Sequence, residues 1–249
     1  MDPVEILKIA GVLMLGSLVQ SSSGIGFGLF GVPLLLVMGF NLPSTVVIIV
    51  IGSAIQKITA IRYLWKAADW GGQAPFMTIS LLGLPLGIYM MYEVSFMSDD
   101  LMKQVIGAIV LLLLILQQIK VIKQREHVAV KWGYIAGFFS GLLNGLANIG
   151  GPPLVLWMLA HKWDNEKMRV TPIAFSILLV PFQLILMMTM FGAQLWPPLL
   201  KALLLTPVVF LGSRIGLKIG DNISTAHLRN YIKILLLIIA LSSILKPLL

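Results

Sequence analysis

The chain has 249 residues, of which 58% are hydrophobic and 11% are charged. Soluble domains carry about 25% charged residues, so this composition excludes a soluble globular protein and predicts an integral membrane protein. The formal net charge of +8 requires no nucleic acid as partner, because basic loops on one side of a lipid bilayer account for it. The chain contains no cysteine, which excludes disulfides, thiolate metal sites and cysteine nucleophiles.

Ten apolar runs predict helices along the whole chain. A first set covers roughly 4–20, 27–39, 43–65, 75–92 and 100–122, and a second covers 132–147, 151–161, 168–190, 195–218 and 226–246. A helix rises about 1.5 Å per residue, so roughly 20 residues cross the hydrocarbon core. The runs 43–65, 100–122, 168–190 and 226–246 reach that length. The runs 27–39 and 151–161 are too short, and each is expected to pair with the run before it, either as a re-entrant hairpin or as short crossings.

Two stretches rich in glycine, proline and small polar residues interrupt the apolar pattern. The first break reads QSSSGIGFGLFGVP over residues 20–33, and the second break reads NGLANIGGPP over residues 144–153. Lipid offers no hydrogen bonds to freed backbone groups, so a membrane helix is interrupted only where protein or a water-filled cavity surrounds the break. The two breaks therefore predict a binding site near the middle of the membrane.

The two sets of runs match each other as weak internal repeats. Gly31 and Pro33 recur 120 positions later as Gly151 and Pro153, and Gln20 corresponds to Asn144. Further along, Thr45 matches Thr171, Leu86-Gly87 matches Leu211-Gly212, and Met102 matches Leu228. Interrupted segments at equivalent places of two repeats are typical of secondary transporters. We therefore expect a first membrane repeat at 1–122, a basic cytoplasmic linker at 123–131 and a second membrane repeat at 132–249.

The basic residues predict how the repeats are oriented. If each broken pair returns to its own side, the loops 66–74, 123–131, 161–169 and 214–229 are cytoplasmic, and 14 of the 18 Lys and Arg lie in or beside them. The second repeat is then inverted relative to the first, and both termini face outward. If each broken pair instead crosses once, the loop 161–169 lies outside and the charge bias is weaker.

The breaks are suited to an anionic ligand. A half-helix that starts within the membrane directs free N–H groups and the positive end of its dipole at the ligand, and neither break contains Asp or Glu. Glycines let a ligand approach the backbone, and prolines suit a first helical turn. The candidate binding residues are Gln20, Ser21, Ser22, Ser23, Gly24, Gly26, Gly28, Gly31, Pro33, Asn144, Asn148, Gly150, Gly151, Pro152 and Pro153. The alternative is that the glycines only permit close helix packing.

Lys57 is a further candidate, because it is an ionisable residue within the run 43–65 and its repeat counterpart is the neutral Gln183. An intramembrane lysine suits an anion or a coupled proton. The alternative is that Lys57 reaches the cytoplasmic headgroups by snorkelling.

An enzyme is not expected. The three histidines, His127, His161 and His227, fall in loops, away from Ser23, and their spacing is not that of a metal site. The glycine-rich run lacks the strand and the Lys-Ser/Thr of a phosphate-binding loop. We expect no metal and no cofactor.

The segments GVPLLL (residues 31–36) and GFFSGLLNGLANIGGPPLVL (residues 137–156) resemble the TauE/SafE family, also called the sulfite exporter family, of prokaryotic membrane permeases. Length, two-repeat layout and the basic central loop also agree with this family. Its members more often carry GxGGG in both breaks, whereas Phe27 and Asn148 stand here, so the size and identity of the substrate are left open.

The resemblance implies a multi-pass permease of the cytoplasmic membrane that moves sulfite, sulfonates or organosulfur carboxylates, often outward. The expected fold is an all-α membrane protein of two inverted repeats, each with a broken helix pair and three transmembrane helices. The expected mechanism is alternating access at the two breaks. The alternatives are an anion channel that uses the breaks as a filter and a non-transporting membrane assembly protein. A coupled proton or sodium ion, and assembly as a homodimer, stay open.

Overall fold

The computed structural model describes residues 2–23, 26–64, 70–116, 125–126, 128–163, 165–222 and 225–245. Within these residues the chain is helical, apart from turns and one isolated β-bridge between Arg125 and His161. The prediction of an all-α protein is confirmed.

The first half forms five helices, whose bounds are α1 (Pro3–Ser23), α2 (Phe27–Val37), α3 (Leu42–Leu64), α4 (Trp70–Ser95) and α5 (Asp99–Leu116). Side chains cap several of their N-termini. The Val4 N–H donates to Asp2 Oδ1 at 3.0 Å, and the Ser44 N–H donates to Asn41 Oδ1 at 2.9 Å. Such caps satisfy backbone donors that have no partner within the helix, and they fix where α1 and α3 begin.

The second half forms α6 (Val130–Ala147), α7 (Gly151–Leu159), α8 (Asn165–Phe191), the 3₁₀ turn η2 (Gly192–Leu195), α9 (Trp196–Leu204), α10 (Thr206–Asn222) and α11 (Thr225–Leu245). The prediction of one continuous segment over 195–218 is wrong, because α9 ends at Leu204 and α10 begins at Thr206. Pro207 has no N–H, and its ring clashes with a carbonyl one turn earlier. The chain therefore turns at Leu205.

Three stretches of the described residues are long and apolar enough to cross a membrane: Pro3–Ser22, Gln73–Ser95 and Val170–Leu204. The helices α2 and α7 have 11 and 9 residues, which correspond to about 16 Å and 14 Å. Neither can cross a core of about 30 Å alone, as the sequence predicts.

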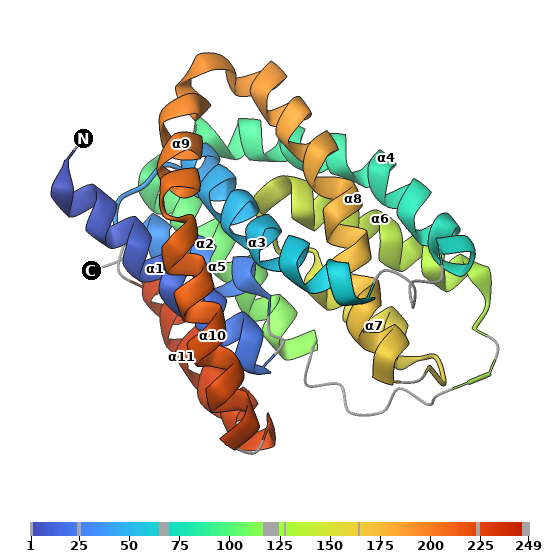
Figure 1. Cartoon of the computed structure of the whole chain (residues 1–249). Helices are drawn as coiled ribbons and strands as arrows, with labels where there is room; N and C mark the ends of the chain where they lie inside the picture. Colours follow the sequence, from blue (N-terminus) through green and yellow to red (C-terminus); the bar gives the residue numbers. More distant parts are fainter. Residues whose placement is uncertain are drawn as a thin grey trace.

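Both broken pairs fold back on themselves. Lys8 Nζ, near the start of α1, lies 3.5 Å from the Met38 carbonyl oxygen at the end of α2. In the second half, the Arg125 N–H donates to the Ala160 carbonyl at 2.9 Å, beside the end of α7. The ends of each hairpin therefore lie together. We call the face with the α2–α3 turn, η2 and both termini the terminal face (Figure 1), and the face with Arg125 and His161 the opposite face.

The two halves pack crosswise, by which we mean that helices of one half pair mainly with helices of the other half. The most extensive helix pairs join α4 to α6 and α1 to α10, while α3 packs on α8 and α5 on α11. Glycines permit the close approach of α4 and α6, since a methyl group at Gly83, Gly87, Gly141 or Gly145 would collide with backbone of the other helix. Gly212 and Gly216 of α10 have the same relation to Met14 and Leu18 of α1.

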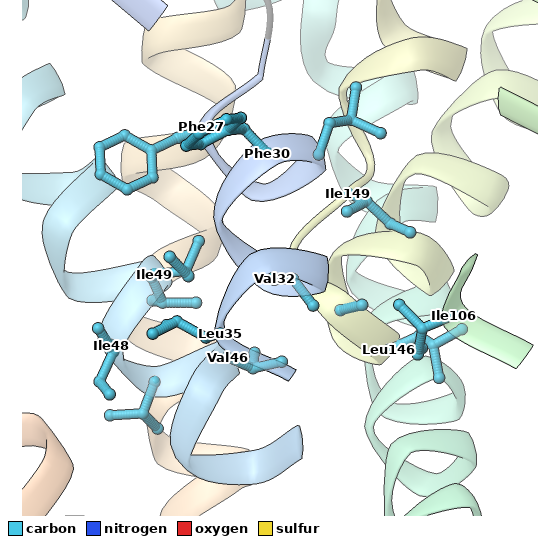
Figure 2. Packing of buried hydrophobic residues seen from close by; sticks show 14 of the residues in the cluster. Phe27, Phe30, Val32, Leu35, Val46, Ile48, Ile49, Ile106, Leu146 and Ile149 are labelled. Atoms are coloured by element: carbon cyan, nitrogen blue, oxygen red, sulfur yellow. The ribbon is translucent and has the colours of Figure 1, made fainter. Parts of the chain in front are cut away.

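The short helix α2 lies in the interior, and nearly all of its residues are buried. Figure 2 shows α2 between α3, which contributes Ile48 and Ile49, and the second break, where Leu146 and Ile149 lie. This packing brings the start of α2 to the start of α7, which positions the site described next.

Candidate functional site

The two breaks touch at Gly28. A methyl group placed there would collide with the backbone carbonyl oxygen of Asn148, so the absence of a side chain lets α2 meet the turn between α6 and α7. Residues 120 positions apart in the sequence are thus in van der Waals contact, as the prediction of one shared site requires.

Each break is capped by an amide side chain from its own hairpin. In the first, the Phe27 N–H donates to Gln20 Oε1 at 2.7 Å. In the second, the Gly150 N–H donates to Asn144 Oδ1 at 3.3 Å, and Ser140 Oγ donates to the Gly150 carbonyl at 2.6 Å. Gln20 and Asn144, which the sequence pairs as repeat counterparts, make the same kind of contact. Their amide oxygens satisfy backbone donors that the interruption frees.

Asn148 ends α6 in the left-handed conformation, with φ 53° and ψ 35°. Its N–H donates to the Asn144 carbonyl at 2.8 Å, and the Ile149 N–H donates to the Leu143 carbonyl at 3.1 Å. Asparagine is one of the few residues other than glycine that adopts this conformation readily. Asn148 therefore makes the sharp turn into the second break while keeping an amide side chain there, and that side chain stays half-buried.

The candidate residues divide by exposure. The buried ones are Ser22, Gly28, Gly31, Pro33, Gly150 and Pro152, and the half-buried ones are Gln20, Ser21, Gly26, Asn144, Asn148, Gly151 and Pro153. Gly24 and the side chain of Ser23 lie outside the described residues. The half-buried group comes from both breaks.

The glycines of the breaks have two different roles. A methyl group at Gly31 would strike Ile49, and one at Gly150 would strike the Ser140 carbonyl and the Asn144 amide, so these glycines permit close packing. Around Gly151 no atom lies within 4 Å of such a methyl group, and at Gly26 the nearest is Leu29 Cδ1 at 3.9 Å. Close packing therefore does not account for either glycine: Gly151 faces open space, and a methyl group at Gly26 would make only an ordinary van der Waals contact.

The number of free N–H groups is smaller than the sequence alone indicates. The Phe27 and Gly150 amides donate to side chains, and Pro152 and Pro153 have no N–H. At the start of α7, the Gly151 N–H has no backbone acceptor among the described residues. The positive end of the α7 dipole lies at this position, so the second break offers one backbone donor.

Two glutamines that sequence reasoning did not assign to the site support the breaks from α3 and α8. Gln56 Nε2 donates to the Ser17 carbonyl at 3.1 Å and to Ser21 Oγ at 2.5 Å. Gln183 Nε2 donates to the Asn144 carbonyl at 2.7 Å. A glutamine within an apolar run is the signal that could have identified them, because a buried amide requires a partner.

Lys57 is directed across the interface between α3 and α8. Its Nζ donates to Ser176 Oγ at 2.9 Å, and the lysine is half-buried. Ser176 lies eleven residues into α8, about 16 Å from its start, which is close to the middle of that 27-residue helix. This contact disfavours snorkelling to the headgroups. Within the described residues, no carboxylate forms an ion pair with Lys57 and no hydrogen bond joins it to either break.

Comparison with known proteins gives a consistent picture. The family described as sulfite exporter TauE/SafE matches residues 9–243. Among curated proteins, the chain is 22% identical over 233 residues to the "Probable sulfite/organosulfonate exporter TauE" of Cupriavidus necator, covering 91% of this chain and 88% of the relative. No solved structure matches the chain. A family match over nearly the whole length, on a helical chain with two broken hairpins, establishes that this protein is a membrane transporter, not an enzyme, and belongs to the TauE/SafE sulfite exporter family.

Proposed function

We propose that the protein is a secondary transporter that exports a small oxyanion, such as sulfite, a sulfonate or an organosulfur carboxylate. The observation that carries this proposal is the contact of the two breaks at Gly28 and Asn148, next to the open backbone positions Gly26 and Gly151. Alternating access would expose this midplane site to each face in turn.

The crosswise packing supports an arrangement of two inverted repeats. The first helix of each half packs on the fourth segment of the other half, α1 on α10 and α6 on α4. The third helices, α3 and α8, pack on each other, and so do the last helices, α5 and α11. A twofold axis that exchanges the halves produces this reciprocal pattern. Such an axis in the membrane plane gives inverted repeats.

The chemistry of the breaks supports an anion as substrate. Gly151 offers an N–H without a backbone acceptor among the described residues at the start of α7, and the half-buried Asn148 lies three residues earlier in the same break. The breaks contain no carboxylate that would attract a cation. The curated relative is described as a probable sulfite or organosulfonate exporter, which agrees with a small sulfur oxyanion.

The test is a methyl group at Gly151, with Gly11 as the matched control. Both positions have no atom within 4 Å of an added methyl group, so neither Gly151→Ala nor Gly11→Ala should disturb folding. Gly11 lies on the exposed side of α1. We expect Gly151→Ala to lower sulfite counterflow in proteoliposomes about tenfold or more, because the added methyl group would fill the space from which an anion reaches the Gly151 N–H, and a lost hydrogen bond to a charged group costs about 1.5–3 kcal/mol. Gly11→Ala should transport like the wild type.

Two results would contradict the proposal. Saturable sulfite counterflow that is the same in Gly151→Ala and the wild type would mean that the start of α7 does not contact the substrate. If the reconstituted wild-type protein moves neither sulfite nor sulfoacetate, the assignment of a small oxyanion is wrong.

A further inference from the structure

A polar cavity of about 450 Å³ opens at the terminal face, away from the two breaks. It lies between the start of α1, the α2–α3 turn, η2 and α9, so both halves of the chain contribute to it. The charged and polar side chains that line it are Asp2, Glu5, Lys8, Asn41, Gln194 and Lys201. Each water molecule takes about 30 Å³ of liquid, so the cavity holds roughly fifteen waters, or a small oxyanion with part of its hydration shell.

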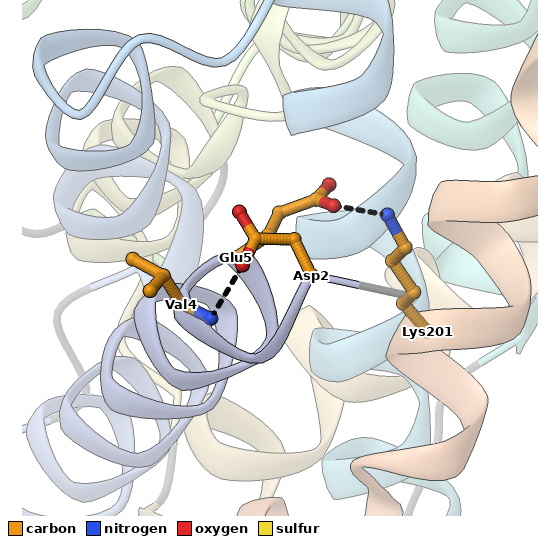
Figure 3. A network of polar contacts seen from close by, with 4 residues as sticks. All are labelled: Asp2, Val4, Glu5 and Lys201. Carbon is orange, nitrogen blue, oxygen red and sulfur yellow. Dashed lines mark hydrogen bonds and ion pairs between the residues drawn. The ribbon is translucent and has the colours of Figure 1, made fainter.

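An ion pair crosses this cavity. Lys201 Nζ of α9 donates to Glu5 Oε2 of α1 at 2.5 Å, as Figure 3 shows. The Lys201 side chain is 13% exposed and that of Glu5 is 34% exposed. The two other ion pairs among the described residues, at 3.1 Å and 3.9 Å, are longer and more exposed. The Glu5–Lys201 pair is therefore the best shielded of the three, and it joins the two halves.

The remaining charges of the cavity leave Lys201 as the main anion-binding group. The carboxylate of Asp2 accepts the Val4 N–H at 3.0 Å and caps α1. Lys8 is exposed, and its Nζ makes only a long contact of 3.5 Å with the Met38 carbonyl. Lys201 is more shielded from water, so its attraction to a negative group is less screened. In this structure Lys201 is paired with the carboxylate of Glu5.

At the opposite face, aromatic side chains fill the interior beside the α6–α7 hairpin. The Phe76 ring stacks on Trp157 with centroids 4.8 Å apart and meets Phe175 edge-on at 5.0 Å. All three residues are buried. Trp157 also contacts His161 and Trp163, at 4.8 Å and 5.1 Å. Among the described residues, the terminal face thus has a polar opening, whereas these aromatic side chains pack closely at the opposite face.

We propose that this cavity is a second binding site for the transported oxyanion, at which the anion displaces the carboxylate of Glu5 from Lys201. The proposal rests on the function proposed above and adds a vestibule to it. An anion that leaves the breaks toward the terminal face is held by Lys201 and Lys8 before release. The carboxylate of Glu5 competes with the anion for Lys201. Once the anion has left, Lys201 and Glu5 form their ion pair again.

The two members of the ion pair are predicted to act in opposite directions. Glu5→Gln removes the competing charge and frees Lys201, so sulfite should bind more tightly. Lys201→Gln removes the binding charge, so sulfite should bind more weakly. We expect the dissociation constant to change by roughly fivefold in each case, because partly exposed charge pairs have modest energies. A purely structural ion pair would instead make both variants weaken binding together.

The experiment measures equilibrium binding of radiolabelled sulfite to the purified full-length protein in detergent. Lys201→Arg keeps the positive charge and should remain within about twofold of the wild type. Lys103→Gln is the matched control, because the Lys103–Asp100 pair lies 3.9 Å apart and involves a largely exposed Asp100. It breaks an ion pair without touching the cavity, so its dissociation constant should not change.

The outcomes separate this inference from the proposed function. Wild-type protein that binds no sulfite contradicts the proposed function. If the wild type binds sulfite but Glu5→Gln and Lys201→Gln shift its dissociation constant in the same direction, or leave it unchanged, the vestibule site alone is overturned. Failure of Glu5→Gln to fold also overturns it, since the pair would then be structural. Opposite changes, with unaltered binding in Lys103→Gln, support the site.

Discussion

Gly28 is the residue at which a single methyl group is predicted to separate the two breaks. Its added Cβ would meet the Asn148 carbonyl oxygen and the carbonyl carbon behind it. Backbone cannot move aside as a flexible side chain can, so Gly28→Ala must separate α2 from the second break. Overpacking of this kind costs about 1–3 kcal/mol. We expect a lower melting temperature in detergent, measured by tryptophan fluorescence.

Gly26→Ala is the control for Gly28→Ala. Gly26 precedes the same helix, has φ −55° and ψ 130°, and has only Leu29 Cδ1 near an added methyl group. Alanine adopts these angles without strain, so the melting temperature should stay unchanged. Equal melting of both variants would show that the breaks do not touch at Gly28.

Lys57 of α3 donates a hydrogen bond to Ser176, which lies near the middle of α8. A positive charge kept there without a carboxylate partner suits a passing anion. Lys57→Gln should therefore lower sulfite counterflow at least about tenfold, a loss of about 1.4 kcal/mol or more in stabilisation of the bound anion. Ser176→Ala, which keeps the charge but removes its hydrogen-bond partner, should have a smaller effect. Folded Lys57→Gln protein with wild-type counterflow would assign this lysine to structure.

At the scale of helices, rows of glycine hold the two crosswise pairs together. Gly141 of α6 lies against the Ser80 carbonyl of α4, and Gly212 of α10 lies against the Met14 carbonyl and Ser17 of α1. Gly141→Val and Gly212→Val should each destabilise the protein by about 3 kcal/mol or more, because bulk is forced between two backbones. Melting temperature and size-exclusion profile measure this loss. Gly11→Val, on an open part of α1, is the control, and similar melting of all three variants would contradict the role of the glycine rows.

Most helix positions could be predicted because apolar runs of membrane length are unambiguous. The break at Leu205, which divides the predicted segment 195–218 into α9 and α10, could not be predicted. Pro207 marks it, yet Pro75 and Pro85 lie within α4, and Pro172 and Pro181 lie within α8, without ending those helices. A membrane helix tolerates a proline when neighbouring groups satisfy the freed carbonyl. Whether they do depends on packing that is not local in the sequence.

The candidate site was predicted in outline but not in its roles. The match of Gln20 with Asn144 located two equivalent side chains, while their function as caps of Phe27 and Gly150 depends on distances across each turn. Gln56 was missed because its partners, Ser17 and Ser21, lie more than thirty positions earlier in the chain. Gly28 packs against backbone, whereas Gly151 faces open space. Which of the two applies to a glycine is decided only by what lies opposite it.

For the molecule as a whole, the two faces differ in charge. The described residues of the terminal face include Asp2, Glu5, Asp99 and Asp100 together with Lys8, Lys103 and Lys201, and those of the opposite face include Arg125, Lys131, Lys162 and Lys167 together with Glu126. Basic loops are retained in the cytoplasm, so the opposite face should be cytoplasmic. The vestibule at Lys201 would then open to the outside, which is the direction that export requires.

Single cysteines test this orientation cleanly because the chain has none of its own. Met97, in the turn between α4 and α5, is 40% exposed, and Ala129, directly before α6, is exposed on the opposite face. A membrane-impermeant maleimide should label Met97→Cys in intact cells and Ala129→Cys only after permeabilisation. The reversed pattern would place both termini and the vestibule in the cytoplasm, so that the same cavity would serve substrate entry. Labelling of both positions from outside would mean that α5 does not separate the two faces, and the assignment of α1–α2 and α6–α7 as hairpins on opposite faces would have to be abandoned.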